Sequence, residues 1–286
     1  MTIQQREVVM GTLYVVGTPI GNLGDMTYRA VETLEKVDFI CAEDTRVSAK
    51  LLNYFEIKTP LVSYHEHNAA QVGEGICDRI AAGESAAIVT DAGMPCISDP
   101  GELLVKMCYE RGIKVEVVPG PSAVISGLAI SGLDTKNFQF EGFLSVTKKQ
   151  RQEHLAAVSK STHTLVFYEA PHKLVNTLED MLKFFGDRRI SLCRELTKLH
   201  EEVVRTTLSQ AVERYSTVKP KGEFVLVIEG AKDSELSPAE TIEQALEQVK
   251  VLMQNGMRGA DACKQIAKAT GFSKGELYTK LLEQKQ

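Results

Sequence analysis

The sequence has no long apolar run, no excess of basic residues and no basic region at its start. Its 286 residues carry 33 lysines and arginines against 38 aspartates and glutamates, a formal net charge of -5. No global positive field therefore favours nucleic acid, although a local basic patch can sit on an acidic protein. Neither a membrane-spanning segment nor a signal peptide is indicated. We expect a cytoplasmic protein with no membrane partner.

The spacing of the metal-binding residue types is also unfavourable for a metal site. The 6 cysteines include no CxxC pair, and most fall in apolar segments, where a reduced thiol behaves as a small hydrophobe. His65 and His67 alternate at the end of a predicted strand, so we expect them to point to opposite faces. The sequence predicts a reducing compartment and no bound metal.

The order of predicted elements divides the chain into three parts. Over roughly the first 120 residues, short apolar runs alternate with amphipathic helices, which is typical of a parallel sheet with helices on both faces. After Asp134, several strands follow with few helices between them, which indicates a mixed sheet. A polar linker, Lys232–Pro238, then precedes helices. We predict two α/β domains, at 1–122 and 123–231, and a small C-terminal helical domain at 238–286.

The stretch Thr90–Gly101, TDAGMPCISDPG, joins a predicted strand to a predicted helix. Asp99 is placed to serve as N-cap, Pro100 as the first helical residue and Glu102 as the returning carboxylate of a capping box. In an open α/β sheet, such a loop lies at the carboxyl ends of the strands. Ligands bind at that edge.

Two other loops follow predicted strands of the same sheet. Gly17–Asp25, GTPIGNLGD, departs from the G-x-G-x-x-G spacing of a dinucleotide fingerprint and lacks the lysine of a phosphate loop. Gly120–Val124, GPSAV, has valine where a nucleophile elbow needs glycine. Taken alone, each is explained as well by a structural turn as by a binding site.

Charged residues form two further clusters at strand ends. Glu43, Asp44 and Arg46 should lie on the same edge as the loops above, where a ligand would sit. The second cluster comprises Arg194, Glu195, Lys198, His200 and Glu201. Each cluster is either part of a site or a solvated strand end, and both readings stay open at this point.

Taken together, these stretches resemble the tetrapyrrole methylase superfamily, and within it the branch that methylates small-subunit ribosomal RNA. The matching motifs run in order from residue 12 to residue 202 and are VVGTPIGNLGD, AEDTR, TDAGMPCISDPG, VPGPSAV, FYEAPHKL and RELTKLHEE. Their combination is far more specific than any one of them. The sequence departs from the family pattern at Met94, Cys96 and Lys173, where threonine, a small or apolar residue and arginine are expected.

The resemblance implies S-adenosylmethionine as methyl donor, bound in a cleft between the two α/β domains. It implies as acceptor the ribose 2′-hydroxyl of a cytidine in the decoding centre of 16S rRNA within the small ribosomal subunit, and it also implies a homodimer. Carried over by motif position, the cofactor-binding residues would be Pro19, Asp91, Ala92, Gly93, Met94, Ile97, Ser122, Ala123, Glu169 and Thr197.

The chemistry of such a transfer suggests what the charged clusters do. A sulfonium methyl is already a good electrophile, so the enzyme must chiefly align donor and acceptor and exclude water. A ribose hydroxyl is a poor nucleophile at neutral pH, so a base or hydrogen-bond acceptor must take its proton. We expect Lys198 or Glu195, with Asp44 and Arg46 from the other domain, to surround that hydroxyl and its phosphate.

RNA contact is expected from local basic segments, namely Lys148, Lys149 and Arg151, and the helices between Arg258 and Lys280. Each segment is explained equally by a helix face exposed to solvent or by helices that only pack against the rest of the protein. Other functions stay open as well. They are methylation of a tetrapyrrole or other small molecule, a nicotinamide-dependent oxidoreductase, and a binding module without chemistry.

Overall fold

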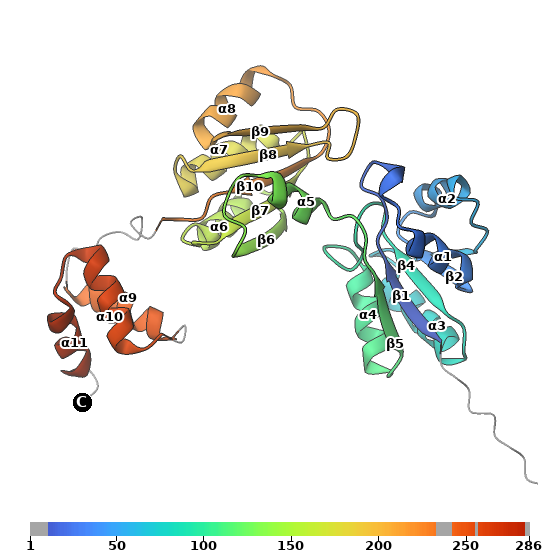
Figure 1. The fold of residues 1–286 in the computed structure, drawn as a ribbon, viewed down its shortest axis with the longest axis horizontal. Coiled ribbons are helices and arrows are strands. Elements are labelled where there is room, and N and C mark those ends of the chain that lie inside the picture. The colour runs from blue at the N-terminus through green and yellow to red at the C-terminus, as the bar shows by residue number, and fades with distance from the viewer. Residues whose placement is uncertain (1–10, 233–241, 255–256, 284–286) are drawn as a thin grey trace, which may run out of the picture.

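The computed structural model in Figure 1 contains two five-stranded sheets and a C-terminal group of helices. The structure describes residues 11–232, 242–254 and 257–283. The predicted fold class, two α/β units followed by helices, is confirmed. The residue boundaries of the three predicted domains stay a prediction. Most of the predicted linker and the start of the helical domain at 238 lie outside the described residues.

The first sheet is parallel throughout, in the order β3-β2-β4-β1-β5. Its strands are β1 (Thr12–Val16), β2 (Phe39–Ala42), β3 (Leu61–Ser63), β4 (Ala86–Val89) and β5 (Lys114–Val118). The connections contain η1 (Leu23–Asp25), α1 (Tyr28–Lys36), α2 (Thr45–Tyr54), α3 (Ala69–Ala81) and α4 (Gly101–Glu110).

Helices cover both faces of this sheet, so β2 and β4 are buried along their whole length. On β4, Ile88 packs into the core formed with α3 and α4, whereas Ala87 and Val89 pack into the core formed with α1 and α2. Because all five strands run the same way, the loops that follow β1, β2, β4 and β5 meet at one edge.

The second sheet is mixed, in the order β6-β7-β10-β8-β9, with β6 parallel to β7 and the other pairs antiparallel. Its strands are β6 (Phe138–Phe143), β7 (Thr164–Glu169), β8 (Arg189–Arg194), β9 (Glu202–Thr207) and β10 (Phe224–Ile228). Its helices are α5 (Ala123–Ile130), α6 (Lys148–Val158), α7 (Leu174–Phe185) and α8 (Leu208–Thr217). Helices α6, α7 and α8 share one core, and α5 packs on the opposite face.

The C-terminal helices are α9 (Ile242–Gln254), α10 (Gly259–Thr270) and α11 (Lys274–Glu283). They bury a core of their own, centred on residues such as Leu246, Ile266 and Leu277. Gly271 ends α10 in the left-handed conformation, with φ of 78°, where glycine carries no steric penalty. The predicted turn between the last two helices is therefore at Gly271. None of the described helices is long and apolar enough to span a membrane.

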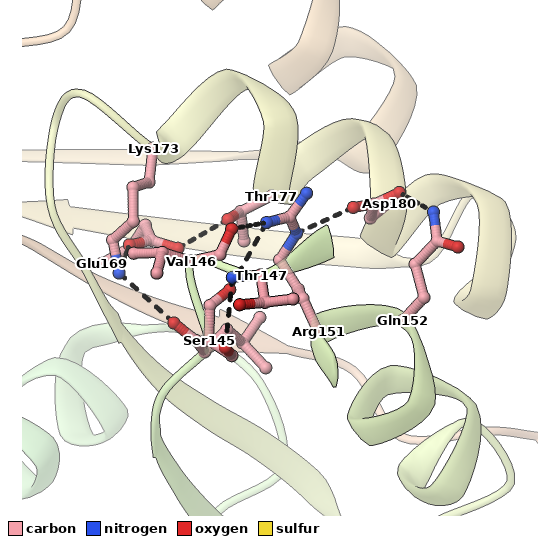
Figure 2. Close-up of polar contacts among 10 residues, drawn as sticks. Ser145, Val146, Thr147, Arg151, Gln152, Glu169, Lys173, Thr177 and Asp180 are labelled. Atoms are coloured by element: carbon pink, nitrogen blue, oxygen red, sulfur yellow. Dashed lines mark hydrogen bonds and ion pairs between the residues drawn. The ribbon is translucent and has the colours of Figure 1, made fainter. Parts of the chain in front are cut away.

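Arg151, which we expected at an RNA phosphate, is buried in the second unit instead. Figure 2 shows its guanidinium between α6 and α7, where Nε donates to Asp180 Oδ2 at 2.8 Å. Burial alone would raise the pKa of Asp180, but hydrogen bonds from Gln152 and Arg151 hold it below its ordinary value. The prediction that Arg151 contacts RNA is therefore wrong. Lys148 and Lys149 remain exposed at the start of α6.

Arg151→Met should lower the free energy of unfolding by about 3–5 kcal/mol, because the Asp180 carboxylate stays buried without its cation. Urea denaturation followed by circular dichroism measures this loss. Lys149→Met, on the exposed side of the same helix, is the matched control and should change stability by less than about 0.5 kcal/mol. Equal stability of the two variants would contradict the structural role of Arg151.

Candidate active site

A cavity of about 500 Å³ lies between the two sheets and takes its walls from both. The first unit contributes the loop between β4 and α4, and the start of α5, which follows β5, lies at the junction of the two units. The second contributes the carboxyl ends of β7 and β8 and the beginning of β10. Side chains of both units, including Met94 and Phe224, therefore line one cavity.

The β4–α4 loop is held in shape by the carboxylate of Asp99. It accepts hydrogen bonds from the backbone N–H of Cys96 at 2.9 Å, Ile97 at 3.2 Å and Gly101 at 2.8 Å. Helix α4 begins at Gly101 with Pro100 in the N-cap position, so the expected N-cap at Asp99 lies one residue too early. The Asp99 side chain still caps the helix, because its Oδ1 accepts from the N–H of Gly101, the first helical residue.

Three loops of the first sheet contact one another through their backbones. A Cβ atom on Gly17 would lie 2.7 Å from the Cα atom of Gly120. The two loops can therefore come this close only because both positions are glycine. Thr18 and Gly93 exchange two backbone hydrogen bonds, of 2.9 and 3.1 Å. The Sδ atom of Met94 accepts the N–H of Gly120 at 3.2 Å. The glycines therefore serve loop packing beside the cavity.

Most residues expected at the cofactor do line this cavity. They are Asp91, Ala92, Gly93, Met94, Ile97, Ser122, Ala123 and Glu169. Pro19 and Thr197 do not line it, although their neighbours Ile20 and Lys198 do. The Oγ1 atom of Thr197 is buried and has no hydrogen-bond partner.

Glu169, at the end of β7, is buried and fully engaged within the protein. Its Oε2 accepts from Thr177 Oγ1 at 2.6 Å, and its Oε1 accepts from the N–H of Ala170 at 2.8 Å. Figure 2 shows Lys173 reaching the same carboxylate, with Nζ 3.1 Å from Oε1. Both carboxylate oxygens are thus occupied, so Glu169 fixes the start of α7 to the cavity wall.

Lys198 connects the two units across the cavity. Its Nζ donates to Glu195 Oε1 and to Glu223 Oε2, each at 2.9 Å. A Cβ atom on Gly21 would lie 2.4 Å from Lys198 Cγ, so the lysine stem lies directly against the β1–α1 loop. Glu195 has φ of 51°, a left-handed conformation that is uncommon for a residue other than glycine. The strained turn after β8 thus holds a cation between two carboxylates.

Both predicted proton-transfer candidates are charged in this arrangement. Burial pulls the pKa of Lys198 down, but its bonds to Glu223 and Glu195 outweigh that effect and raise the pKa above its ordinary value. Burial pushes the pKa of Glu195 up, but the Glu223 N–H and the Lys198 ammonium bring it below its ordinary value. A protonated lysine cannot take a proton, so of the two only Glu195 is equipped to accept one.

Asp44 and Arg46 lie outside the cavity lining, while their neighbour Glu43 is part of it. The Asp44 carboxylate accepts two bonds from the Arg46 guanidinium, at 3.0 and 2.7 Å, which lower the pKa of Asp44 to about 2. The N–H of Asp44 donates to Asp91 Oδ1 at 3.2 Å. Because α2 begins at Thr45, Asp44 becomes its N-cap and reaches the site only through Asp91.

His65 and His67 do not diverge as we expected. Their rings lie edge to face with centroids 6.0 Å apart. The expectation was wrong because positions two apart on a strand share a face, and both histidines also lie beyond the end of β3 at Ser63. Within the described ranges, no group of three histidine, cysteine, aspartate or glutamate side chains could hold a metal ion.

Sequence reasoning missed several cavity residues of the second unit. Phe143, Tyr168, Glu223 and Phe224 line the cavity, as do the apolar residues Leu196 and Val225. Tyr168 and Leu196 stand in the motifs FYEAPHKL and RELTKLHEE, so both could have been included. The others lie in apolar strands or beside a turn, and nothing in their local pattern distinguishes them from core residues.

Comparison with known proteins is consistent with this geometry. Residues 12–212 match the family model described as Tetrapyrrole (Corrin/Porphyrin) Methylases. The solved structure of uroporphyrin-III-C-methyltransferase from Thermus thermophilus superposes with a TM-score of 0.55 at 20% identity, covering 77% of this chain and 94% of that one. That likeness concerns the fold. The chain belongs to the tetrapyrrole methylase family of methyltransferases.

Its relatives define the branch within that family. A protein from Halalkalibacterium halodurans is 47% identical over 278 residues, which cover 96% of both chains. A protein from Thermotoga maritima is 47% identical over 221 residues, which cover 77% of this chain and 99% of that one. Both are named ribosomal RNA small subunit methyltransferase I, and the chain is a member of this group.

Lys198→Met should raise the pKa of Glu195, because burial of the carboxylate persists while the neighbouring ammonium is lost. Lys198→Arg keeps the positive charge and should leave the pKa low. The carboxyl ¹³C shift of labelled glutamate, followed against pH and assigned with Glu195→Gln, measures the change. An identical titration in wild type and Lys198→Met would show that the lysine does not control Glu195.

Proposed function

We propose that this protein transfers a methyl group from S-adenosylmethionine to small-subunit ribosomal RNA. The acceptor in this proposal is the ribose 2′-hydroxyl of a cytidine in the decoding centre of 16S rRNA. One observation supports it above the rest: a cavity between two sheets is bordered by small residues of the first unit and by the Glu195–Lys198–Glu223 cluster of the second. Membership of the rRNA methyltransferase group supports the acceptor class.

The residues present suit S-adenosylmethionine. The cavity volume, about 500 Å³, falls within the usual range of small-molecule sites. Ala92, Gly93 and Ala123 leave backbone groups open to close approach. The carboxylates of Glu43 and Asp91 offer acceptors at the same wall. When bound, the cofactor supplies an electrophilic methyl group on sulfur. Pro19 and Thr197 remain proposed contacts beside this lining.

Glu195 and Lys198 are the proposed acceptor and its positioning cation. Both hydrogen bonds to Glu195 reach Oε1, which leaves Oε2 to accept the proton of the ribose hydroxyl. Lys198 keeps this carboxylate ionised and adds positive charge for a neighbouring phosphate. From the first unit, Asp44 positions Asp91 through its N–H, and the exposed guanidinium of Arg46 is placed for phosphate contact.

Recognition of RNA away from the cavity is assigned to exposed lysines. Lys148 and Lys149 lie at the start of α6, and α10 and α11 carry further basic residues, including Lys264, Lys268 and Lys274. We also retain the homodimer and the cytoplasmic location that the resemblance implies. The edge strand β5 carries the exposed apolar side chain of Val117, which a second copy could cover.

S-adenosylmethionine should stabilise the protein against heat, whereas NAD should not. At a ligand concentration 100 times Kd, the expected gain is about 2.7 kcal/mol in the free energy of unfolding. Ala123→Leu fills the cavity and should abolish the gain, whereas Ala157→Leu, on the exposed side of α6, should keep it. Stabilisation by NAD alone would instead favour a nicotinamide-dependent oxidoreductase.

Tritium from labelled cofactor should enter 16S rRNA when small subunits lacking the modification are offered. Glu195→Gln should lower the transfer rate by more than about 100-fold with cofactor affinity by calorimetry nearly unchanged, because general-base contributions have this size. Glu213→Gln, on the exposed side of α8, is the matched control. Label in a tetrapyrrole but not in RNA would favour the small-molecule alternative, and full activity of Glu195→Gln would remove Glu195 from the mechanism.

A further inference from the structure

Phe143 is an aromatic side chain that the rest of the protein buries only in part. It lies at the end of β6, lines the cavity and is 58% exposed. Large aromatic rings stabilise folds mainly by being buried, so such exposure beside a cavity calls for an explanation. The residues around it give one.

A bulge in β6 directs Phe143 to the cavity side of the sheet. Phe140 pairs with Val166 and Phe143 pairs with Tyr168, so Glu141 is an extra residue in the register. Val166 and Tyr168 are two residues apart on β7 and therefore face the same way. Without the bulge, alternation would have placed Phe140 and Phe143 on opposite faces.

The ring of Phe143 is held in place by its neighbours. Its centroid lies 5.3 Å from that of Tyr168, which also packs edge to face against Phe140 at 5.0 Å. Lys173 Nζ lies 5.7 Å from the Phe143 centroid and is itself anchored to Glu169. A platform fixed in this way loses little conformational freedom when a ligand covers it.

Phe143 also stands beside the loop that we assign to the cofactor. A Cβ atom on Gly142 would lie 3.4 Å from Ser98 Oγ in the β4–α4 loop, and Ile97 of the same loop is 59% exposed. A group resting on Phe143 would therefore lie next to the methyl-donor site, at the open side of the cavity.

We propose that Phe143 is the platform on which the base of the target nucleotide stacks while its ribose enters the cavity. The proposal rests on the proposed function. Unstacked bases of single-stranded RNA are received by aromatic side chains, and enzymes that act on a base within a stacked strand turn its nucleotide out of the stack. Phe143 is thus a positioning residue for the acceptor, and the cation of Lys173 lies within reach of the same ring.

Three variants test this inference. Phe143→Leu keeps apolar volume without a stacking face, Phe143→Trp keeps the face, and Phe138→Leu is the control, since Phe138 is 40% exposed on the same strand but does not line the cavity. Thermal melting confirms that each variant folds. The readouts are kcat/KM for unmodified small subunits, Kd for S-adenosylmethionine, and quenching of a fluorescent cytidine analogue at the target position.

Phe143→Leu should lower kcat/KM for subunits by about 10- to 100-fold, the effect of losing one base–aromatic stack. It should also abolish the quenching, with the cofactor Kd changed by less than about 2-fold. Phe143→Trp and Phe138→Leu should stay near wild type. Equal weakening of the cofactor Kd would assign the ring to the donor and overturn the inference, as would full activity of Phe143→Leu.

The proposed function fails separately from this inference. If wild type transfers no methyl group to RNA, the proposed function is wrong, and the stacking role of Phe143 is wrong with it. If wild type is active and Phe143→Leu matches it in rate and quenching, only the platform is wrong.

Discussion

The cavity depends on how closely the backbones of the first sheet approach at its carboxyl edge. Gly17 and Gly120 leave no room between them for a Cβ atom, and Met94 joins them through its sulfur. A side chain at either glycine would push two loops apart and displace the wall that carries Gly93. The close contact therefore positions the β4–α4 loop, on which the proposed donor site is built, and the Asp99 carboxylate preserves its shape.

The opposite wall is organised by charge. Lys198 lies between Glu195 and Glu223, so one cation offsets two carboxylates at the edge of an enclosed space. The arrangement keeps Glu195 ionised although it is partly buried, which a hydrogen-bond acceptor for a hydroxyl needs. The stem of the same lysine lies against Gly21 of the β1–α1 loop, so this side chain belongs to the contact between the two units as well as to the charged cluster.

Local patterns were a good guide to the elements and a partial guide to the site. The apolar runs and cap residues predicted the parallel sheet, and the small-residue loops after β4 and β5 do line the cavity. Arg151 was misassigned because a basic helix start reads alike whether it meets solvent or a buried partner such as Asp180. Asp44 was placed in the cavity because the sequence does not show that helix capping turns it away in favour of Glu43.

The sequence by itself determined the fold class, the loops at the sheet edge and the family, since these depend on local periodicity and on residues close together in the chain. Only the tertiary structure decided which side chains share the cavity, because that depends on contacts across two sheets. Glu223 and Phe143 show the difference. One becomes part of the site through an ion pair with Lys198, 25 positions earlier, and the other through a bulge that changes which face of β6 it occupies.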